Sequence, residues 1–193
     1  MADVAFSCAC GTLQGVVRDA APAKCCHLIC YCSDCRAFAR HMGQLDALEP
    51  GGGSPLVQVL PAQVDITQGA DQIACLRLSP KGLNRWYAAC CNTPLANTPS
   101  TSKIPFAGMW RPLFETHAPF GKVTTFGFTK MARPGGARKD KGLARMLGGI
   151  LKRTLSAYLN GTARQNPFFD ATGAPVSPPH VISAEDRTAA YRE

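Results

Sequence analysis

Residues 30–36 are Cys30-Tyr31-Cys32-Ser33-Asp34-Cys35-Arg36, and this stretch is the most informative part of the sequence about fold and function. Side chains two apart on a strand point to the same face, so Cys30 and Cys32 can present two thiolates to one ion. The Cys-x-x-Cys spacing lets a tight turn bring Cys35 back to the same point, as tetrahedral Zn–S bonds of about 2.3 Å require. The spacing predicts a metal centre, with free thiols and a disulfide as the alternatives.

Three protein ligands with an open fourth position are typical of a catalytic or ligand-binding zinc. We therefore expect Cys30, Cys32 and Cys35 to be metal ligands and, together with Arg36, to form the catalytic group. Arg36 can pair with a substrate carboxylate; alternatively, it only offsets the negative charge of the thiolates. His27 and His41 are the candidates for a fourth ligand, and Asp34 is expected to form a turn.

Two further cysteine clusters flank this stretch, Cys8-Ala9-Cys10-Gly11 and Cys90-Cys91-Asn92. We expect the metal ligands Cys8, Cys10, Cys90 and Cys91 to join into a closed structural site, which makes one or two zinc ions in total. Soft thiolate ligands select zinc over magnesium or calcium. The remaining cysteines are expected to be buried as small hydrophobic residues; they are Cys25, Cys26 and Cys75.

The composition fits a reduced compartment. All ten cysteines of the 193-residue chain lie between Cys8 and Cys91. The N-terminus has no basic, apolar signal sequence, and no apolar run reaches the roughly 18 residues of a membrane span. The expectation is a cytoplasmic protein with no membrane partner, in which cysteines bind metal rather than form disulfides.

The net charge of +8 lies entirely in the second half, because residues 1–100 carry seven basic and seven acidic residues. Apolar residues at helical spacing predict an amphipathic helix at about 140–160, whose apolar side is expected to pack on a sheet. Its basic face allows nucleic-acid or membrane-surface binding as alternatives. The absence of interleaved aromatic residues argues against single-stranded nucleic acid.

The predicted fold is α+β and mainly β. Strands are expected at 4–10, 25–32, 57–67 and 73–78, with the last two paired. The tail from Asn166 onward is expected to wrap the surface with little regular structure. The composition shift predicts a zinc-binding β domain over 1–105 and a basic extension over 106–193. The sequence does not specify an oligomeric state.

The order of motifs resembles the glutathione-dependent formaldehyde-activating enzyme (GFA-like) family over roughly residues 6–100. The matching pieces are C-x-C-G at Cys8, C-x-C-x-x-C-R at Cys30, and Arg85-Trp86-Tyr87 ahead of Cys91-Asn92-Thr93-Pro94-Leu95. The family's last motif, C-x-x-C-G, is altered here, because Ala88 and Asn92 stand at its first Cys and its Gly. Cys90 is the candidate replacement ligand.

This resemblance implies an Mss4-like fold of small curled antiparallel sheets, a structural zinc on the outer clusters and a second zinc on the middle one. It also implies glutathione as a thiol partner and a carbon–sulfur lyase reaction between that thiol and an aldehyde. The alternative function is a non-catalytic zinc-binding module whose basic C-terminal half binds a partner.

Overall fold

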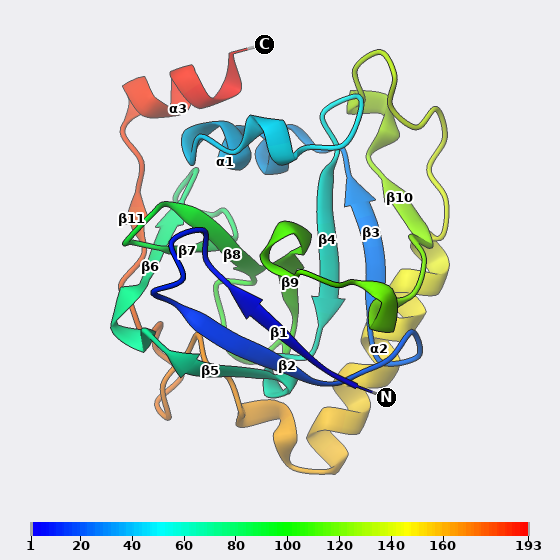
Figure 1. Ribbon diagram of the computed structural model, residues 1–193, viewed down its shortest axis with the longest axis vertical. Coiled ribbons are helices and arrows are strands. Elements are labelled where there is room, and N and C mark those ends of the chain that lie inside the picture. The colour runs from blue at the N-terminus through cyan, green and yellow to red at the C-terminus, as the bar shows by residue number, and fades with distance from the viewer. Residues whose placement is uncertain (1, 193) are drawn as a thin grey trace.

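The computed structural model describes residues 2–192, which form two β-sheets and three α-helices (Figure 1). The smaller sheet is antiparallel and has the order β1 (Ala2–Ser7), β2 (Gln14–Ala20), β5 (Val64–Gln68). The larger sheet has the order β10 (Thr125–Gly127), β3 (Cys26–Cys30), β4 (Ser54–Val59), β9 (Ala107–Trp110), β8 (Thr93–Thr98), β7 (Asn84–Ala88), β6 (Ile73–Arg77), β11 (His180–Val181).

The two edge strands of the larger sheet, β10 and β11, run parallel to their neighbours, and the other pairings are antiparallel. The helices are α1 (Ser33–His41), α2 (Leu143–Leu159) and α3 (Ala184–Tyr191). One-turn 3-10 helices lie between these elements at Leu45–Ala47, Pro61–Gln63, Ala70–Gln72, Arg111–Leu113, Ala118–Phe120, Thr129–Met131 and Thr162–Arg164. The prediction of an α+β, mainly β fold is confirmed.

The predicted pairing of the strands on either side of Gly69 is wrong. β5 joins the smaller sheet beside β2, whereas β6 joins the larger sheet beside β7. Gly69 has φ +69° and opens a 3-10 turn, and an added Cβ there would lie 2.4 Å from the carbonyl oxygen of Thr12. This close approach redirects the chain between sheets, so two consecutive strands do not form a hairpin.

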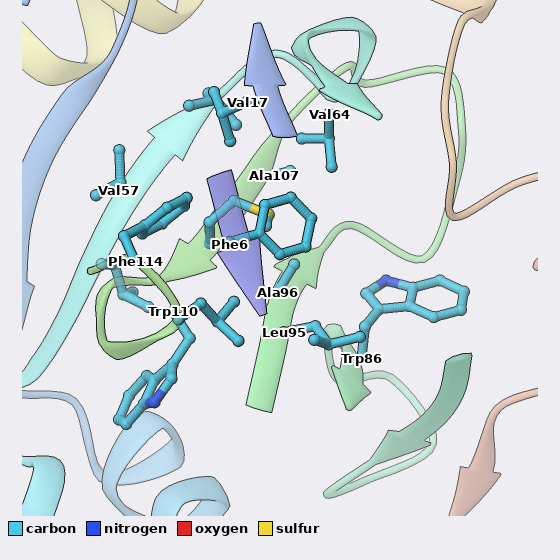
Figure 2. Packing of buried hydrophobic residues seen from close by; sticks show 14 of the residues in the cluster. Phe6, Val17, Val57, Val64, Trp86, Leu95, Ala96, Ala107, Trp110 and Phe114 are labelled. Carbon is cyan, nitrogen blue, oxygen red and sulfur yellow. The ribbon is translucent and has the colours of Figure 1, made fainter. Parts of the chain in front are cut away.

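The main core lies between the two sheets (Figure 2). β1 alternates exposed and buried residues, which directs Val4 and Phe6 toward the larger sheet. Phe6 meets Phe114 edge to face, with the ring centroids 5.9 Å apart. Burial of each such side chain stabilises the fold by about 1.5–3 kcal/mol.

The second half of the chain packs on the first half at several places. Phe168 and Phe169 are buried against Trp86, with centroid distances of 5.2 and 5.9 Å. β9, β10 and β11 pair with strands of the first hundred residues, and α3 packs on α1. The tail was expected to contain little regular structure, but it supplies the short strand β11 and the helix α3. The proposed boundary at residue 105 stays a prediction.

α2 confirms the predicted helix, but its apolar side does not pack on the sheet as expected. Leu147, Leu151, Leu155 and Leu159 are between 58% and 80% exposed. The helix contacts the core instead through half-buried Met146 and buried Ala157. No helix within residues 2–192 combines the length and the apolar character needed to cross a bilayer.

Candidate metal centres

The first candidate centre begins in the turn that follows β1. The Gly11 N–H donates to the Cys8 carbonyl at 2.9 Å, and Gly11 has φ +76°, so the chain reverses immediately after Cys10. The Leu13 N–H then donates to the Cys8 sulfur at 3.3 Å. This turn directs both sulfurs to one side. Neither cysteine lies on a strand, because β1 ends at Ser7 and is shorter than the predicted strand over 4–10.

The second half of this centre is the turn between β7 and β8. The N–H groups of Cys91 and Asn92 both donate to the Ala88 carbonyl, and Asn92 adopts a left-handed conformation with φ +55°. Asn tolerates this conformation better than most residues. The turn is what allows two adjacent cysteines, Cys90 and Cys91, to aim at the same point.

The four sulfurs form a compact group. Sγ–Sγ distances are 3.6 Å for Cys8–Cys10, 3.7 Å for Cys8–Cys90, 3.4 Å for Cys10–Cys90 and 3.8 Å for Cys90–Cys91. All four sulfurs lie within 4.8 Å of one another. A tetrahedral zinc with Zn–S bonds of about 2.3 Å has sulfurs about 3.8 Å apart, so the donor set and the spacing fit this metal.

The environment of Cys10 also favours metal binding, because it promotes the thiolate form. The Cys10 sulfur lies 3.2 Å from the Thr12 hydroxyl, and hydrogen bonds from Thr12 lower the pKa of the Cys10 thiol to about 6. A thiolate is the form that ligates zinc. Thr93 closes the arrangement by accepting the Ala9 N–H at 3.0 Å, which links the two turns.

The second candidate centre lies where β3 meets α1. Cys30 is the last residue of β3, Cys32 is the N-cap of α1, and Cys35 lies in the first turn of that helix. The Cys30 and Cys32 sulfurs are 3.4 Å apart, and all three sulfurs lie within 4.8 Å of one another. The structure therefore brings together the three residues that the spacing predicted.

The start of α1 stabilises these thiolates. The Cys35 N–H donates to the Cys32 sulfur at 3.4 Å, in the way that an N-cap side chain normally accepts. The positive end of the helix dipole favours negative charge at this position. Cys30 and Cys35 are buried, while Cys32 is partly exposed, so solvent reaches the group at Cys32.

Arg85 on β7 is a site residue whose role the sequence analysis did not predict, although Arg85 belongs to one of the matching motifs. Its side chain is only 3% exposed, and its guanidinium donates to the Cys35 sulfur at 3.6 Å. Hydrogen bonds from Cys30 and Cys32, together with Arg85, lower the pKa of Cys35 despite its burial. A charged residue in the otherwise apolar run Trp86-Tyr87-Ala88 was the available signal, because an arginine is rarely buried without a partner.

The other nearby candidates lie outside the three-sulfur group and make contacts of their own. Asp34 accepts a hydrogen bond from the Tyr191 hydroxyl at 2.6 Å, which ties α3 to α1. The Arg36 guanidinium donates to the Met131 carbonyl at 3.1 Å. His41 is the last residue of α1, and the Nδ1–H of His27 donates to the Gly121 carbonyl at 2.8 Å, so neither histidine joins the cysteine group.

Two three-dimensional groups of cysteines compatible with metal therefore exist within residues 2–192, one with four sulfurs and one with three. Both are built from soft donors that suit zinc. Cys25, Cys26 and Cys75 are buried outside these groups, in line with the expectation of small hydrophobic cysteines.

Comparison with known proteins identifies one solved structure and one protein family that are similar to this chain. The chain is similar to the crystal structure of a Rhodobacter sphaeroides protein, a structural genomics target, at 17% identity and a TM-score of 0.39, over 62% of this chain and 96% of that one. A comparison with curated proteins finds no match. Neither result names the GFA-like family, so the activity that this resemblance implies remains a proposal. A model described as "Family of unknown function (DUF6151)" matches residues 1–178, and the chain belongs to this family.

Proposed function

We propose that this protein binds two zinc ions, one in a closed four-cysteine site that serves the fold and one in a three-cysteine site that accepts an external thiol. The observation that carries the proposal is the group of Cys30, Cys32 and Cys35. Within residues 2–192, no fourth cysteine, histidine or carboxylate places a ligand atom within 4.8 Å of all three sulfurs. Three ligands and a vacant position are typical of zinc sites that bind substrate.

A zinc ion held there would act as a Lewis acid that favours the thiolate form of an incoming thiol. The chain's own residues support this chemistry in two ways. Arg85 places a buried positive charge against Cys35, which offsets the negative charge of three thiolates and a bound thiol. Partly exposed Cys32 leaves one side of the group open to solvent.

The finer proposal is a carbon–sulfur lyase-like reaction on a glutathione-type thiol and an aldehyde. In the forward direction, the thiol sulfur forms a bond to the aldehyde carbon, the carbonyl oxygen takes up the thiol proton, and a hemithioacetal results without a redox change. Arg36, next to Cys35 in sequence, is the candidate partner for a substrate carboxylate. The support for this activity is the motif resemblance together with the three-cysteine geometry.

The test is calorimetric titration of the zinc-loaded protein with glutathione and, as a matched control, with S-methylglutathione, which lacks a free thiol. The proposal expects binding of glutathione alone, and loss of that binding in Cys32→Ser. Cys91→Ser, in the other centre, should retain it if the variant folds. Equal heats from both ligands, or none from glutathione, would overturn the thiol site.

A second candidate is the non-catalytic zinc-binding module whose basic half binds a partner. Two observations favour it: the charge excess of residues 101–193 and the exposed apolar face of α2. A zinc-loaded protein that ignores glutathione but binds a partner through α2 would support this reading instead.

A further inference from the structure

The outer face of α2 is a continuous apolar stripe open to solvent. Leu147, Leu151, Leu155 and Leu159 recur every four residues, so they lie along one side of the helix. Each is at least 58% exposed, and Tyr158 beside them is 54% exposed. Scattered apolar residues are normal on a surface, but a contiguous stripe marks an interaction site.

The leucines of this stripe are not needed to hold α2 in place. On its inner side, Arg153 donates to the amide oxygen of buried Gln58, and Met146 and Ala157 pack inward. The Tyr158 hydroxyl donates to the Lys103 carbonyl at 2.5 Å. The helix is thus anchored on one face and presents leucines on the other.

The charge next to the stripe is of one sign. From Lys141 to Phe169 the sequence has five basic residues and no acidic residue. Of these, Arg145 and Lys152 are exposed on α2 itself. Two copies of this helix packed face to face would bring these cations together with no carboxylate between them. The charge pattern therefore argues against a second copy as the occupant.

We propose that α2 docks flat on an anionic lipid surface, with the leucine stripe inserted at the level of the headgroups and Arg145 and Lys152 facing the lipid phosphates. A leucine face bordered by basic residues is what binds such surfaces without crossing them. The helix of 17 residues is about 25 Å long, which is enough for a lateral anchor. The proposal replaces the expectation of no membrane partner, and it is independent of the thiol chemistry.

The position of α2 is compatible with both functions at once. In Figure 1 α2 lies beside β3 and β10 at the lower side of the molecule, whereas α1 and α3 lie at the opposite end. The Cys30, Cys32 and Cys35 group is at the start of α1. A lipid surface under α2 therefore leaves that group facing away from the lipids.

The test is sedimentation of the zinc-loaded full chain with two kinds of vesicle, phosphatidylcholine alone and phosphatidylcholine containing phosphatidylserine. We expect binding to the anionic vesicles only, and weaker binding as salt is raised. The double variant Leu151→Glu, Leu155→Glu should lose about 100-fold or more in affinity. Leu83→Glu, an exposed leucine in the β6–β7 loop, is the matched control and should bind like the wild type.

Light scattering of the same proteins identifies the competing occupants. A monomeric wild type that binds anionic vesicles supports the proposal. A wild-type dimer that the double glutamate variant converts to monomer, with no vesicle binding by either, overturns it in favour of a second copy. A wild-type monomer that ignores both vesicles also overturns it and leaves another protein as the occupant. Circular dichroism checks that the variants keep α2, and Lys152→Glu, which preserves the stripe, should still weaken vesicle binding about fivefold.

Discussion

Arg85 carries a positive charge into the interior of the protein and places it against the three-cysteine group. It reaches the Cys35 sulfur and lies 3.9 Å from the Asp34 carboxylate, while its guanidinium stands 5.6 Å from the centre of the Phe38 ring. Burial lowers the pKa of Arg85, but the negative charges of Cys35, Cys32 and Asp34 together raise this pKa above its usual value. The thiolates and this cation therefore stabilise each other.

We expect Arg85→Met to weaken zinc binding at the three-cysteine centre by about 10–100-fold, the usual effect of removing a group that hydrogen-bonds a metal ligand. Competition with a chromogenic chelator measures this affinity. Arg85→Lys should recover part of the loss, because it returns the charge. Arg18→Met, which removes an exposed cation, is the control; equal affinity in Arg85→Met and Arg18→Met would refute the assigned role.

Asn92 controls the second turn of the four-cysteine centre through its positive φ. A β-branched residue is poorly tolerated in this conformation, so Asn92→Val should cost about 1–2 kcal/mol of unfolding free energy. Asn92→Gly should cost little or nothing. Urea denaturation in the presence of zinc measures both, and a Val variant as stable as the Gly variant would show that the turn does not depend on this conformation.

His27 is 4% exposed, and burial lowers its pKa. The unfolded chain, with a pKa of about 6.5 at this residue, then binds the extra proton more readily, so stability falls as the pH drops below that value. His27→Asn keeps a donor for the Gly121 carbonyl but does not titrate. We expect its stability to change less than that of the wild type between about pH 7 and pH 5. Parallel curves for the two proteins would be the contrary result.

The sequence predicted which cysteines converge, because Cys-x-Cys and Cys-x-x-Cys restrict the possible turns. It did not predict which local structure orients their sulfurs. The sulfurs of Cys8, Cys10 and Cys32 are aimed by turns and a helix N-cap rather than by strand alternation. The role of Arg85 was not predicted because its partner, Cys35, is 50 residues away in sequence, and only the fold brings the two together.

At the scale of whole elements, the local sequence pattern predicted where α2 lies in the chain but not which of its faces is covered. Helical periodicity gave the span of α2 closely, since it depends only on nearby residues. The same periodicity says nothing about which face is covered, and the leucine face is open. α3 was missed because it is short and weakly amphipathic, although Ser183 caps its start by accepting from the Asp186 N–H.

α3 is held on α1 in part by the hydrogen bond from Tyr191 to Asp34. Tyr191→Phe removes this bond and keeps the packing, so we expect a loss of about 1 kcal/mol in the local stability of α3. Hydrogen exchange of the amides of residues 184–191 measures this, with the amides of β4 as an internal reference that should not change. Unchanged exchange in α3 would indicate that packing alone holds it.

At the scale of the whole molecule, the second half of the chain completes the sheet that the first half begins. β10 and β11 are the edge strands of the larger sheet, paired with β3 and β6, and edge strands as short as these offer little backbone for pairing with other chains. Composition does not encode non-local pairing of this kind. The sequence therefore indicated a domain boundary at residue 105 but not the strand pairs that join the two sides of it.

The two cysteine groups differ in how far apart in sequence their segments lie. One joins the turn after β1 to the β7–β8 turn, and the other joins the end of β3 to α1, with Arg85 of β7 against it. With zinc bound as proposed, one ion would fasten the two sheets together and the other would offer an open position for a substrate.

Native mass spectrometry of the zinc-loaded protein tests this account most directly. We predict two zinc ions in the wild type, one in Cys32→Ser, which keeps the four-cysteine centre, and one in Cys10→Ser, which keeps the three-cysteine centre. A wild type that carries no zinc, or a Cys32→Ser variant that carries as much zinc as the wild type, would contradict it.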